Sequence, residues 1–556
     1  MSHAKQVANP PNILIIMADD LGFSDLGCYG SEIETPRLDA LARHGVLMSS
    51  FYCAPFCSPS RAMLHTGLDA HLVGFGALKE VMDPRQAGKP GYEMHLNDRA
   101  PTIAERLLRS GYETFLSGKW HLGRHPQHWP SARGFQRSFG LIDGSASHFS
   151  DMATWSNDPA CMPQALFQEN GQVTRFSEHG SYSTEVYTQW LMRQLQSRSE
   201  MQVPFFAMLN YTAPHFPLHA PDGDIARYDR TYQAGYDAIR RRRWERQQEM
   251  GWFGGIQAPA QSSAKWPKWE ELSPGLQALE ARNMAVYAAM VSNMDRHIGM
   301  LLDTLERMDQ LDDTLVIFLS DNGAEGNSVL DTERTREWVH RQMDNSLANR
   351  GRPGSFIEQG PGWAQVSNTP LRMYKSFTYE GGIRVPFIAK LPRQSGLGHV
   401  CDCYAHVTDI VPTLLDLAGI DMQAVDWPRP IPALPGRSML PAWRAQSRSV
   451  HAGNEWTGWE MQGRNALRCG RWKLVHCNQP WGGNAWELYD VESDPAESRN
   501  LAGELPEQVG TMLRSWHDYV QRNGVVVADD MADSMVYSNA CRYYEDLAHD
   551  LAQEAE

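Results

Sequence analysis

The chain has 556 residues, which exceeds the size at which a single hydrophobic core usually stops growing, so about two domains are expected. Hydrophobic residues make up 42% and charged residues 21%, as in an ordinary globular protein. The net charge of −15 argues against a nucleic-acid partner but leaves anionic small molecules open as substrates, because a site can be locally positive on an acidic protein.

The sequence predicts neither secretion nor membrane insertion. Residues 1–6 contain no apolar segment of the signal-peptide kind, and the longest clean apolar run, residues 13–18, is too short to span a bilayer. The nine cysteines are dispersed and odd in number, which is typical of free thiols in a reducing compartment. We therefore expect a cytoplasmic protein with no membrane partner.

Short apolar runs rich in β-forming residues alternate with amphipathic helical stretches, which predicts an α/β fold with a large, mostly parallel sheet and helices on both faces. Four runs end in polar residues: 13–17 before Asp19 and Asp20, 114–116 before Lys119 and His121, 205–209 before His215, and 315–319 before Asp321 and Asn322. Ligands bind at the C-terminal edge of the strands in such sheets, so these ends indicate one site assembled from distant segments.

Between the third and fourth runs the sequence predicts helices. Apolar residues recur at helical spacing from Tyr287 to Met308, and we expect this stripe to lie in the core. The basic run Arg240 to Arg243 predicts a solvated helix face. It belongs to residues 228–269, which we expect to form an insertion beside the sheet that walls the substrate cleft.

After about Val450 the pattern changes. Residues 466–477 predict two short antiparallel strands around Gly470, and residues 506–522 predict a helix that packs on this small sheet. We therefore divide the chain into a large α/β domain, residues 1–449, and a small C-terminal domain, residues 450–556.

The C-terminal tail is acidic but retains more apolar side chains than a purely solvated tail needs. We expect it to dock on its own chain or on a neighbouring subunit, which would make a homo-oligomer. The apolar residues are Met531, Met535, Tyr537, Tyr543, Tyr544 and Leu547.

The polar strand ends suit a hard metal ion. Asp19, Asp20, Asp321 and Asn322 offer carboxylate and amide oxygens, which suit Ca²⁺ or Mg²⁺ better than zinc. Clustered carboxylates without a cation would repel one another and raise their pKa values. Asp19-Asp20 alone is equally typical of a helix cap, but a second acidic strand end favours the metal interpretation.

The most distinctive segment is Pro55 to Gly67, which reads Cys57-x-Pro59-x-Arg61, then an apolar helical turn, then Thr66-Gly67. A cysteine near a proline is usually a small buried hydrophobe. The full pattern is much rarer, and it resembles the signature of the type I sulfatases of the alkaline phosphatase superfamily. Further segments match in order and spacing: Asp19 to Gly22, Gly111 to His121, Ala213 to His215, Ser320 to Gly323, and Pro370-Leu371-Arg372-x-x-Lys375.

This resemblance, nearest to the soluble bacterial arylsulfatases, implies a cofactor and a set of site residues. A formylglycine-generating enzyme would convert Cys57 to formylglycine, the precursor of the nucleophile. One divalent cation, Ca²⁺ with Mg²⁺ as the alternative, would be bound by Asp19, Asp20, Asp321 and Asn322. Around the sulfate would lie Arg61, Lys119, His121, His215 and Lys375. No Asp-x-x-x-His or Asp-His pattern occurs at these positions, which argues against the two-zinc sites of the wider superfamily.

The implied mechanism suits these residue types. One hydroxyl of the formylglycine hydrate would lose its proton to Asp321 and attack sulfur. His215 would protonate the leaving oxygen, a role worth ~10²–10⁴ in rate. His121 would then take the proton of the second hydroxyl, so that sulfate leaves and the aldehyde reforms. Positive side chains would stabilise the sulfate oxygens.

Three functions remain open from the sequence. The first is a hydrolase of sulfate monoesters, with aryl sulfates as its substrates. The second is a phosphonate monoester hydrolase or phosphodiesterase that uses the same formylglycine site. The third is a catalytically inactive binding relative, which the intact set of residues disfavours.

Overall fold

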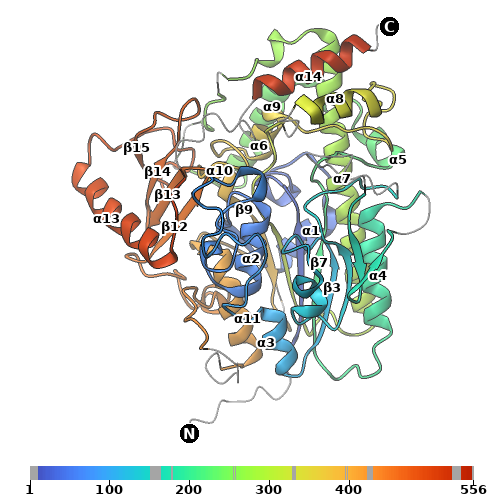
Figure 1. The fold of residues 1–556 in the computed structure, drawn as a ribbon, viewed down its shortest axis with the longest axis vertical. Coiled ribbons are helices and arrows are strands. Elements are labelled where there is room, and N and C mark those ends of the chain that lie inside the picture. The colour runs from blue at the N-terminus through green and yellow to red at the C-terminus, as the bar shows by residue number, and fades with distance from the viewer. Residues whose placement is uncertain are drawn as a thin grey trace.

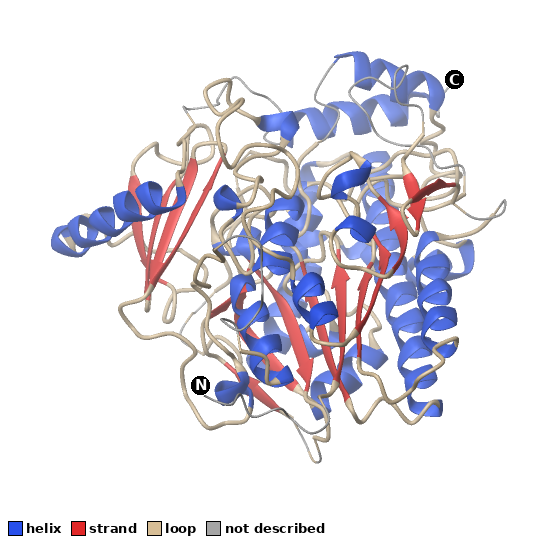
Figure 2. Ribbon diagram, turned by 60° about the horizontal axis from the view of Figure 1, so that its bottom comes forward, coloured by secondary structure: helices blue, strands red, loops and turns tan. Residues whose placement is uncertain are grey.

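The computed structural model contains two β-sheets that lie side by side, each covered by helices (Figures 1 and 2). It describes residues 10–150, 164–176, 180–254, 256, 258–263, 265–328, 333–394, 396, 398–421, 430–528 and 540–553. None of the described helices combines the length and the apolar character that crossing a bilayer requires.

The large sheet is mixed, with parallel strands at its centre. Its strand order is β10-β2-β9-β8-β1-β7-β3-β4-β5-β6, and β11 pairs with β2. Neighbours from β8 to β4 run parallel, whereas β9, β5 and β6 pair in the antiparallel sense. The strands are β1 (Asn12–Ala18), β2 (Val46–Tyr52), β3 (Glu113–Gly118), β4 (Arg137–Leu141), β5 (Phe167–Glu169), β6 (Gln172–Thr174), β7 (Phe205–Asn210), β8 (Thr314–Ser320), β9 (Arg384–Lys390), β10 (His399–Cys401) and β11 (Ala405–His406).

Strand β1 shows why this sheet is buried on both faces. All seven of its residues are buried, as expected of a central parallel strand that reads as a continuous apolar run. Successive side chains alternate between the faces, so Leu14 and Ile16 belong to one core and Ile13 and Ile15 to the other. The predicted α/β class and the four predicted strands are confirmed.

Helices cover both faces of the large sheet. One core contains the 34-residue helix α7 together with α1 and α4, and the other contains α2, α3 and α11. The helices are α1 (Pro36–His44), α2 (Cys57–Thr66), α3 (Ile103–Arg109), α4 (Ser183–Gln196), α5 (Asp222–Ile225), α6 (Tyr236–Glu249), α7 (Pro274–Arg307), α8 (Glu333–Gln342), α9 (Pro361–Ser367), α10 (Glu380–Ile383), α11 (Ile410–Ala418), α12 (Leu440–Trp443), α13 (Pro506–Asn523) and α14 (Ala540–Gln553).

The predicted core stripe lies on α7 and is confirmed. The helix begins with a capping hydrogen bond from the Leu276 amide to the Ser273 side chain, followed by Pro274 at its first position. Every stripe residue is buried: Met290, Met294, Ile298, Leu301, Leu302 and Leu305.

The small sheet is antiparallel, in the order β12 (Trp456–Met461), β13 (Arg464–Cys469), β14 (Trp472–His476) and β15 (Trp486–Asp490). The predicted hairpin is β13–β14, and Gly470 at its turn has a positive φ of 56°. Helix α13 lies along one face of this sheet (Figure 1). Trp516 and Tyr519 of the helix belong to the same apolar cluster as Leu467 and Leu474 of the sheet. The predicted hairpin and helix are confirmed, while the division of the chain at residue 450 stays a prediction.

The described part of the C-terminal tail, α14, docks on its own chain (Figure 1). Tyr543 and Leu547 pack against Leu279 of α7, and Asp550 pairs with Arg350 at 3.1 Å. Met531, Met535 and Tyr537 lie outside the described residues. A homo-oligomer stays a prediction.

The predicted solvated face of Arg240 to Arg243 is wrong at both ends of the run. Arg241 and Arg242 are exposed, but Arg240 and Arg243 lie on the opposite side of α6 and are buried. Arg243 pairs there with Asp25 at 2.6 Å. Residues three apart lie on the same face of a helix, so Arg240 and Arg243 are buried together while the two arginines between them face solvent.

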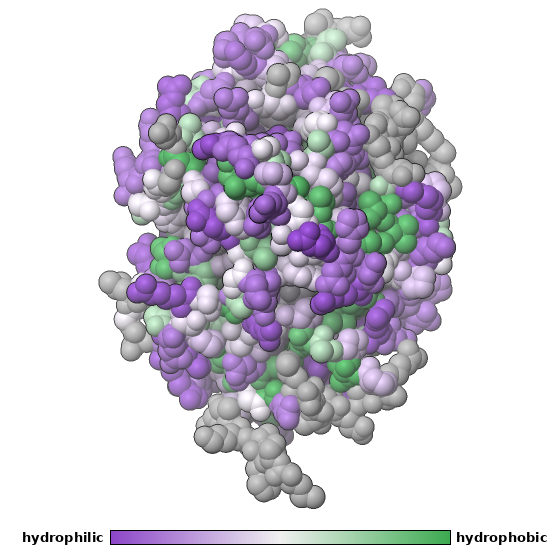
Figure 3. Space-filling model, turned by 90° about the vertical axis from the view of Figure 1, so that its left-hand side faces the viewer, coloured by the Kyte–Doolittle hydropathy of each residue, from purple (hydrophilic) through white to green (hydrophobic). Residues whose placement is uncertain are grey.

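The molecular surface over the small sheet is mostly hydrophilic, with apolar side chains in separate spots (Figure 3). Among the residues that the structure describes, these cysteines are free thiols: Cys28, Cys53, Cys57, Cys401, Cys403, Cys469 and Cys477.

Candidate active site

The C-terminal ends of four parallel strands converge on one buried site. Strand β1 is in register with both β8 and β7 up to their last residues, so the loops that follow begin at the same level. The side chains that these loops deliver are buried and lie close together, as the sequence predicted: Asp19, Asp20, Lys119, His215, Asp321 and Asn322.

Each carboxylate of the site has its own basic partner. The Lys119 Nζ lies 2.6 Å from Asp19 Oδ2, and Lys375 Nζ lies 2.8 Å from Asp20 Oδ2. Arg61 donates two hydrogen bonds to Asp321 Oδ2, at 2.8 and 3.0 Å. Lys375 thus joins the site although it follows no strand of the sheet.

The oxygen atoms of the site fit a hard divalent cation. Asp19 Oδ1 and Asn322 Oδ1 are buried and accept no hydrogen bond from the described residues. The Asn322 amide group donates instead to Asp20 Oδ1 at 2.6 Å, which leaves its own oxygen free. Burial and the neighbouring Asp19 raise the pKa of Asp321 to about 6. A cation would relieve that repulsion, so these residues would hold it.

Cys57 is the first residue of α2 and lies at the centre of the site. Its Sγ lies 3.3 Å from His121 Nδ1, and burial raises the pKa of the thiol. Arg61 follows one turn later on the same helix face, which explains the four-residue spacing of the motif. Gly67 ends the helix with a left-handed φ of 72°, which explains the glycine at the end of the motif.

The two histidines differ in their surroundings. Burial and the nearby Lys119 and Arg61 lower the pKa of His121 well below its ordinary value. The His121 ring packs so closely on Gly144 that a Cβ there would lie 2.6 Å from the ring. Burial also lowers the pKa of His215, against the opposing effect of Asp20.

The orientation of His215 is fixed by its two ring nitrogens. Its Nδ1 is 2.7 Å from the carbonyl oxygen of Phe216, to which it can only donate. Its Nε2 is therefore directed at the reaction site, 3.5 Å from Asp20 Oδ2. Nε2 is thus the ring nitrogen that faces the acidic residues of the site.

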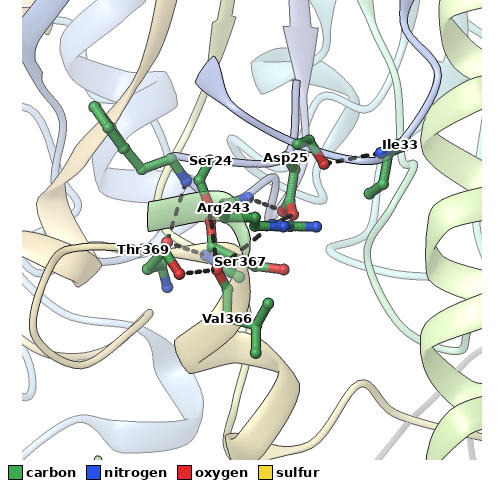
Figure 4. Close-up of polar contacts among 12 residues, drawn as sticks. Ser24, Asp25, Ile33, Arg243, Val366, Ser367 and Thr369 are labelled. Carbon is green, nitrogen blue, oxygen red and sulfur yellow. Dashed lines mark hydrogen bonds and ion pairs between the residues drawn. The ribbon is translucent and has the colours of Figure 1, made fainter. Parts of the chain in front are cut away.

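Residues that the sequence analysis missed hold the loop that follows β1 and carries Asp19 and Asp20. The Tyr287 hydroxyl donates to Asp25 Oδ2 at 2.7 Å and also lies 3.2 Å from the carbonyl oxygen of Asp20. Figure 4 shows Arg243 beside Asp25, with Ser24 hydrogen-bonded to the backbone of Val366. These partners come from α6, α7 and α9, and only their burial in the fold reveals them.

Glu325 is the other residue that the sequence analysis missed. Its Oε2 lies 3.1 Å from Lys375 Nζ, and the side chain is 5% exposed. It follows Asp321 by four residues in the same loop, and that closeness was the one available signal.

The family model described as Sulfatase matches residues 11–420. The chain belongs to the sulfatase family. A second model, described as N-sulphoglucosamine sulphohydrolase, C-terminal, matches residues 372–519. This sulfatase is 38% identical to an uncharacterized sulfatase of Schizosaccharomyces pombe over 95% of this chain and 97% of that one. It is 37% identical to an arylsulfatase of Klebsiella aerogenes, over 81% of this chain and 96% of that one.

Solved structures share the fold. The crystal structure of Ps i-CgsB has a TM-score of 0.65 at 25% identity and covers 97% of this chain and 100% of that one. BT4656 in complex with its substrate D-Glucosamine-2-N, 6-O-disulfate has a TM-score of 0.59 at 19% identity, over 94% of this chain and 100% of that one. The predicted family and fold are confirmed, and the chain is an enzyme that hydrolyses sulfate esters.

Proposed function

We propose that this sulfatase hydrolyses aryl sulfate monoesters, with formylglycine at position 57 and one bound Ca²⁺. The observation that carries the proposal is the position of Cys57, whose sulfur lies beside His121 among three buried basic side chains and the oxygen ligands. The sulfur marks the place that the formylglycine oxygens would take. The hydrate would supply the attacking hydroxyl and the cation would stabilise its deprotonated form.

Three basic residues would hold the sulfate group. Arg61, Lys119 and Lys375 are each at most 2% exposed, and a charge acts more strongly in such a site than in water. Because each is already paired with a carboxylate, its position is set before the substrate arrives. Such preorganised charge is what stabilises the oxygens of a sulfate group in the transition state.

The two histidines and Asp321 would move protons. His215 presents Nε2 to the reaction site and would protonate the leaving oxygen, since an anionic substrate beside the ring opposes the lowering of its pKa. His121 is 3.3 Å from the atom of residue 57 and, being neutral, would accept a proton there. Asp321 would accept the first proton.

Apolar side chains next to the reaction centre support an aryl substrate. Phe56 precedes residue 57 and Phe216 follows His215, and both belong to one cluster. The cluster also contains Leu78, Val81, Val339, Phe356 and Met461. An aromatic leaving group would find apolar surface there, and the similarity to an arylsulfatase points the same way.

Calcium suits the ligand set better than magnesium. Asp19, Asp20, Asp321 and Asn322 are all buried and together make a protein-only group of oxygen ligands. Magnesium usually keeps several waters and is bound by one or two carboxylates, whereas Ca²⁺ accepts many protein oxygens. We expect Ca²⁺ to bind more tightly than Mg²⁺ in a direct titration of metal-free protein.

The test combines mass spectrometry with a substrate panel. Intact and peptide masses establish whether residue 57 is formylglycine, which requires a formylglycine-generating enzyme in the producing cell. The modified protein is then assayed with 4-nitrophenyl sulfate and with a phenyl phosphonate ester. Faster turnover of the phosphonate ester would favour the alternative, a phosphonate monoester hydrolase or phosphodiesterase, and unmodified cysteine in fully active protein would exclude the formylglycine mechanism.

A further inference from the structure

Glu325 is a buried carboxylate that contacts the sulfate site without being one of its expected ligands. Its Oε2 is 3.1 Å from Lys375 Nζ, the nitrogen that also lies 2.8 Å from Asp20 Oδ2. The Lys375 ammonium group therefore pairs with two carboxylates at once. Both acids are at most 5% exposed, so solvent screens these charges little.

The position of Glu325 is built into the loops around it. Its Oε1 accepts hydrogen bonds from the backbone and side-chain nitrogens of Asn327, at 2.8 and 2.7 Å. The Lys375 amide donates to the carbonyl oxygen of Ala324 at 3.0 Å, and the Ser376 amide donates to that of Pro55 at 2.8 Å. These bonds fix Glu325 and Lys375 relative to each other and to the loop that leads to residue 57.

Glu325 also changes the charge balance of the site. The basic residues Arg61, Lys119 and Lys375 face three carboxylates in direct ion pairs, and Glu325 is a fourth. A sulfate monoester carries one negative charge, whereas a phosphate monoester carries two once the pH exceeds its second pKa of about 6. The negative charge of Glu325 beside Lys375 would repel the second charge of a phosphate monoester, a cost that a monoanionic sulfate ester does not meet.

We propose that Glu325 is a positioning and specificity-determining residue, which holds Lys375 in place and disfavours dianionic phosphate monoesters relative to monoanionic sulfate monoesters. This assignment rests on the proposed sulfate site. Selectivity would then come from electrostatic repulsion of phosphate monoesters, in addition to the contacts that favour sulfate monoesters.

The test compares Glu325→Gln, which removes the charge and keeps the shape, with Glu325→Asp, which keeps the charge. Enzyme with verified formylglycine is assayed at about pH 8, where the phosphate ester is a dianion. The substrates are 4-nitrophenyl sulfate, 4-nitrophenyl phosphate and the monoanionic diester bis(4-nitrophenyl) phosphate. Competitive inhibition by phenyl phosphate gives the same comparison if phosphate turnover is too slow to measure.

We expect Glu325→Gln to raise kcat/KM for the phosphate monoester relative to the sulfate ester by about tenfold, the effect of one unit charge acting over several Å at intermediate dielectric. The ratio of diester to sulfate activity should stay nearly constant, because both substrates are monoanions. Glu325→Asp should retain most of the wild-type selectivity. The control variant is Glu280→Gln. Glu280 is a buried carboxyl on α7 beside Tyr543 of α14, so its substitution should leave all ratios unchanged.

Two outcomes would overturn the assignment. Equal losses for all three substrates in Glu325→Gln would show a structural role only. An unchanged ratio of phosphate to sulfate activity, with unchanged inhibition by phenyl phosphate, would show that the charge has no part in selectivity. Failure of the wild-type enzyme to hydrolyse 4-nitrophenyl sulfate would instead refute the proposed aryl sulfate function, independently of the variants.

Discussion

His71 connects the segment after α2 to the small sheet, and its ionisation should affect stability. Its Nδ1 lies 2.9 Å from Asp69 Oδ1 and its Nε2 lies 3.4 Å from Glu460 Oε2 on β12. Burial alone would lower the pKa of His71, but hydrogen bonds and charges from these two acids outweigh it and raise the pKa to about 9. The side chain is 4% exposed, so the interaction is barely screened by solvent.

The size of the effect follows from the pKa. An unfolded histidine has a pKa near 6.5, and the folded value of about 9 corresponds to about 3 kcal/mol of stabilisation of the charged form. Because the folded pKa is the higher one, this stabilisation is fully present below pH ~6.5 and is lost as the pH rises through about 9. His71→Gln should therefore cost about 3 kcal/mol near pH ~6 and much less near pH ~10.

The assay is denaturant unfolding of the wild-type protein and of His71→Gln between pH ~6 and pH ~10, with tryptophan fluorescence as the signal. His406→Gln is the matched control, because burial lowers the pKa of this equally buried histidine to about 4. His406 is neutral above pH ~7 in the folded and the unfolded state, so its substitution should have a constant cost there. A cost of His71→Gln that is the same at both ends of the range would refute the reasoning.

The remaining predictions concern the reaction. Cys57→Ala and Cys57→Ser should both abolish sustained turnover of 4-nitrophenyl sulfate while circular dichroism stays unchanged, and wild-type-like turnover by either would sink the formylglycine mechanism. Asn322→Ala should weaken cation binding by about tenfold in a calorimetric titration, the loss of one oxygen ligand, and EDTA should stop the wild-type enzyme until Ca²⁺ is added. Full activity in demonstrably metal-free protein would contradict that site. His121→Ala should give a burst of phenol followed by slow turnover with sulfated enzyme, whereas His215→Ala should steepen the dependence of rate on leaving-group pKa. A burst and added sulfate mass in His215→Ala alone would show that the two roles are reversed.

The sequence predicted those parts of the site that stand at the ends of apolar strands. Asp19 and Asp321 follow runs of buried apolar residues, and an acidic residue directly after such a run is conspicuous because it breaks the apolar pattern of the strand. The parallel pairing then brings such ends together without further information. The motif at Cys57 was visible for a different reason, since it spans one short helix with a fixed residue spacing and a glycine cap at its C-terminal end.

The residues that the sequence analysis missed make contacts with distant partners in otherwise polar surroundings. Arg243 stands among four arginines, and nothing local distinguishes it from Arg242, which is exposed. Its partners Asp25 and Glu32 are more than 200 residues away. A polar helix reads as solvated unless the fold places an acid against it, so this burial is decided by tertiary structure alone.

Glu325 illustrates the same limit inside the active site. Asp321 and Asn322 are the first two residues of the loop after β8, and this position at a strand end identifies them as candidate site residues. Glu325 has no such mark, because its partner Lys375 reaches the site from a segment that follows no strand of the sheet. The residues that match the family signature lie in short local motifs. The Glu325–Lys375 ion pair, which we propose sets substrate selectivity, joins segments that only the folded chain brings together. For this reason selectivity has to be sought among the ion pairs of the site and not in its signature.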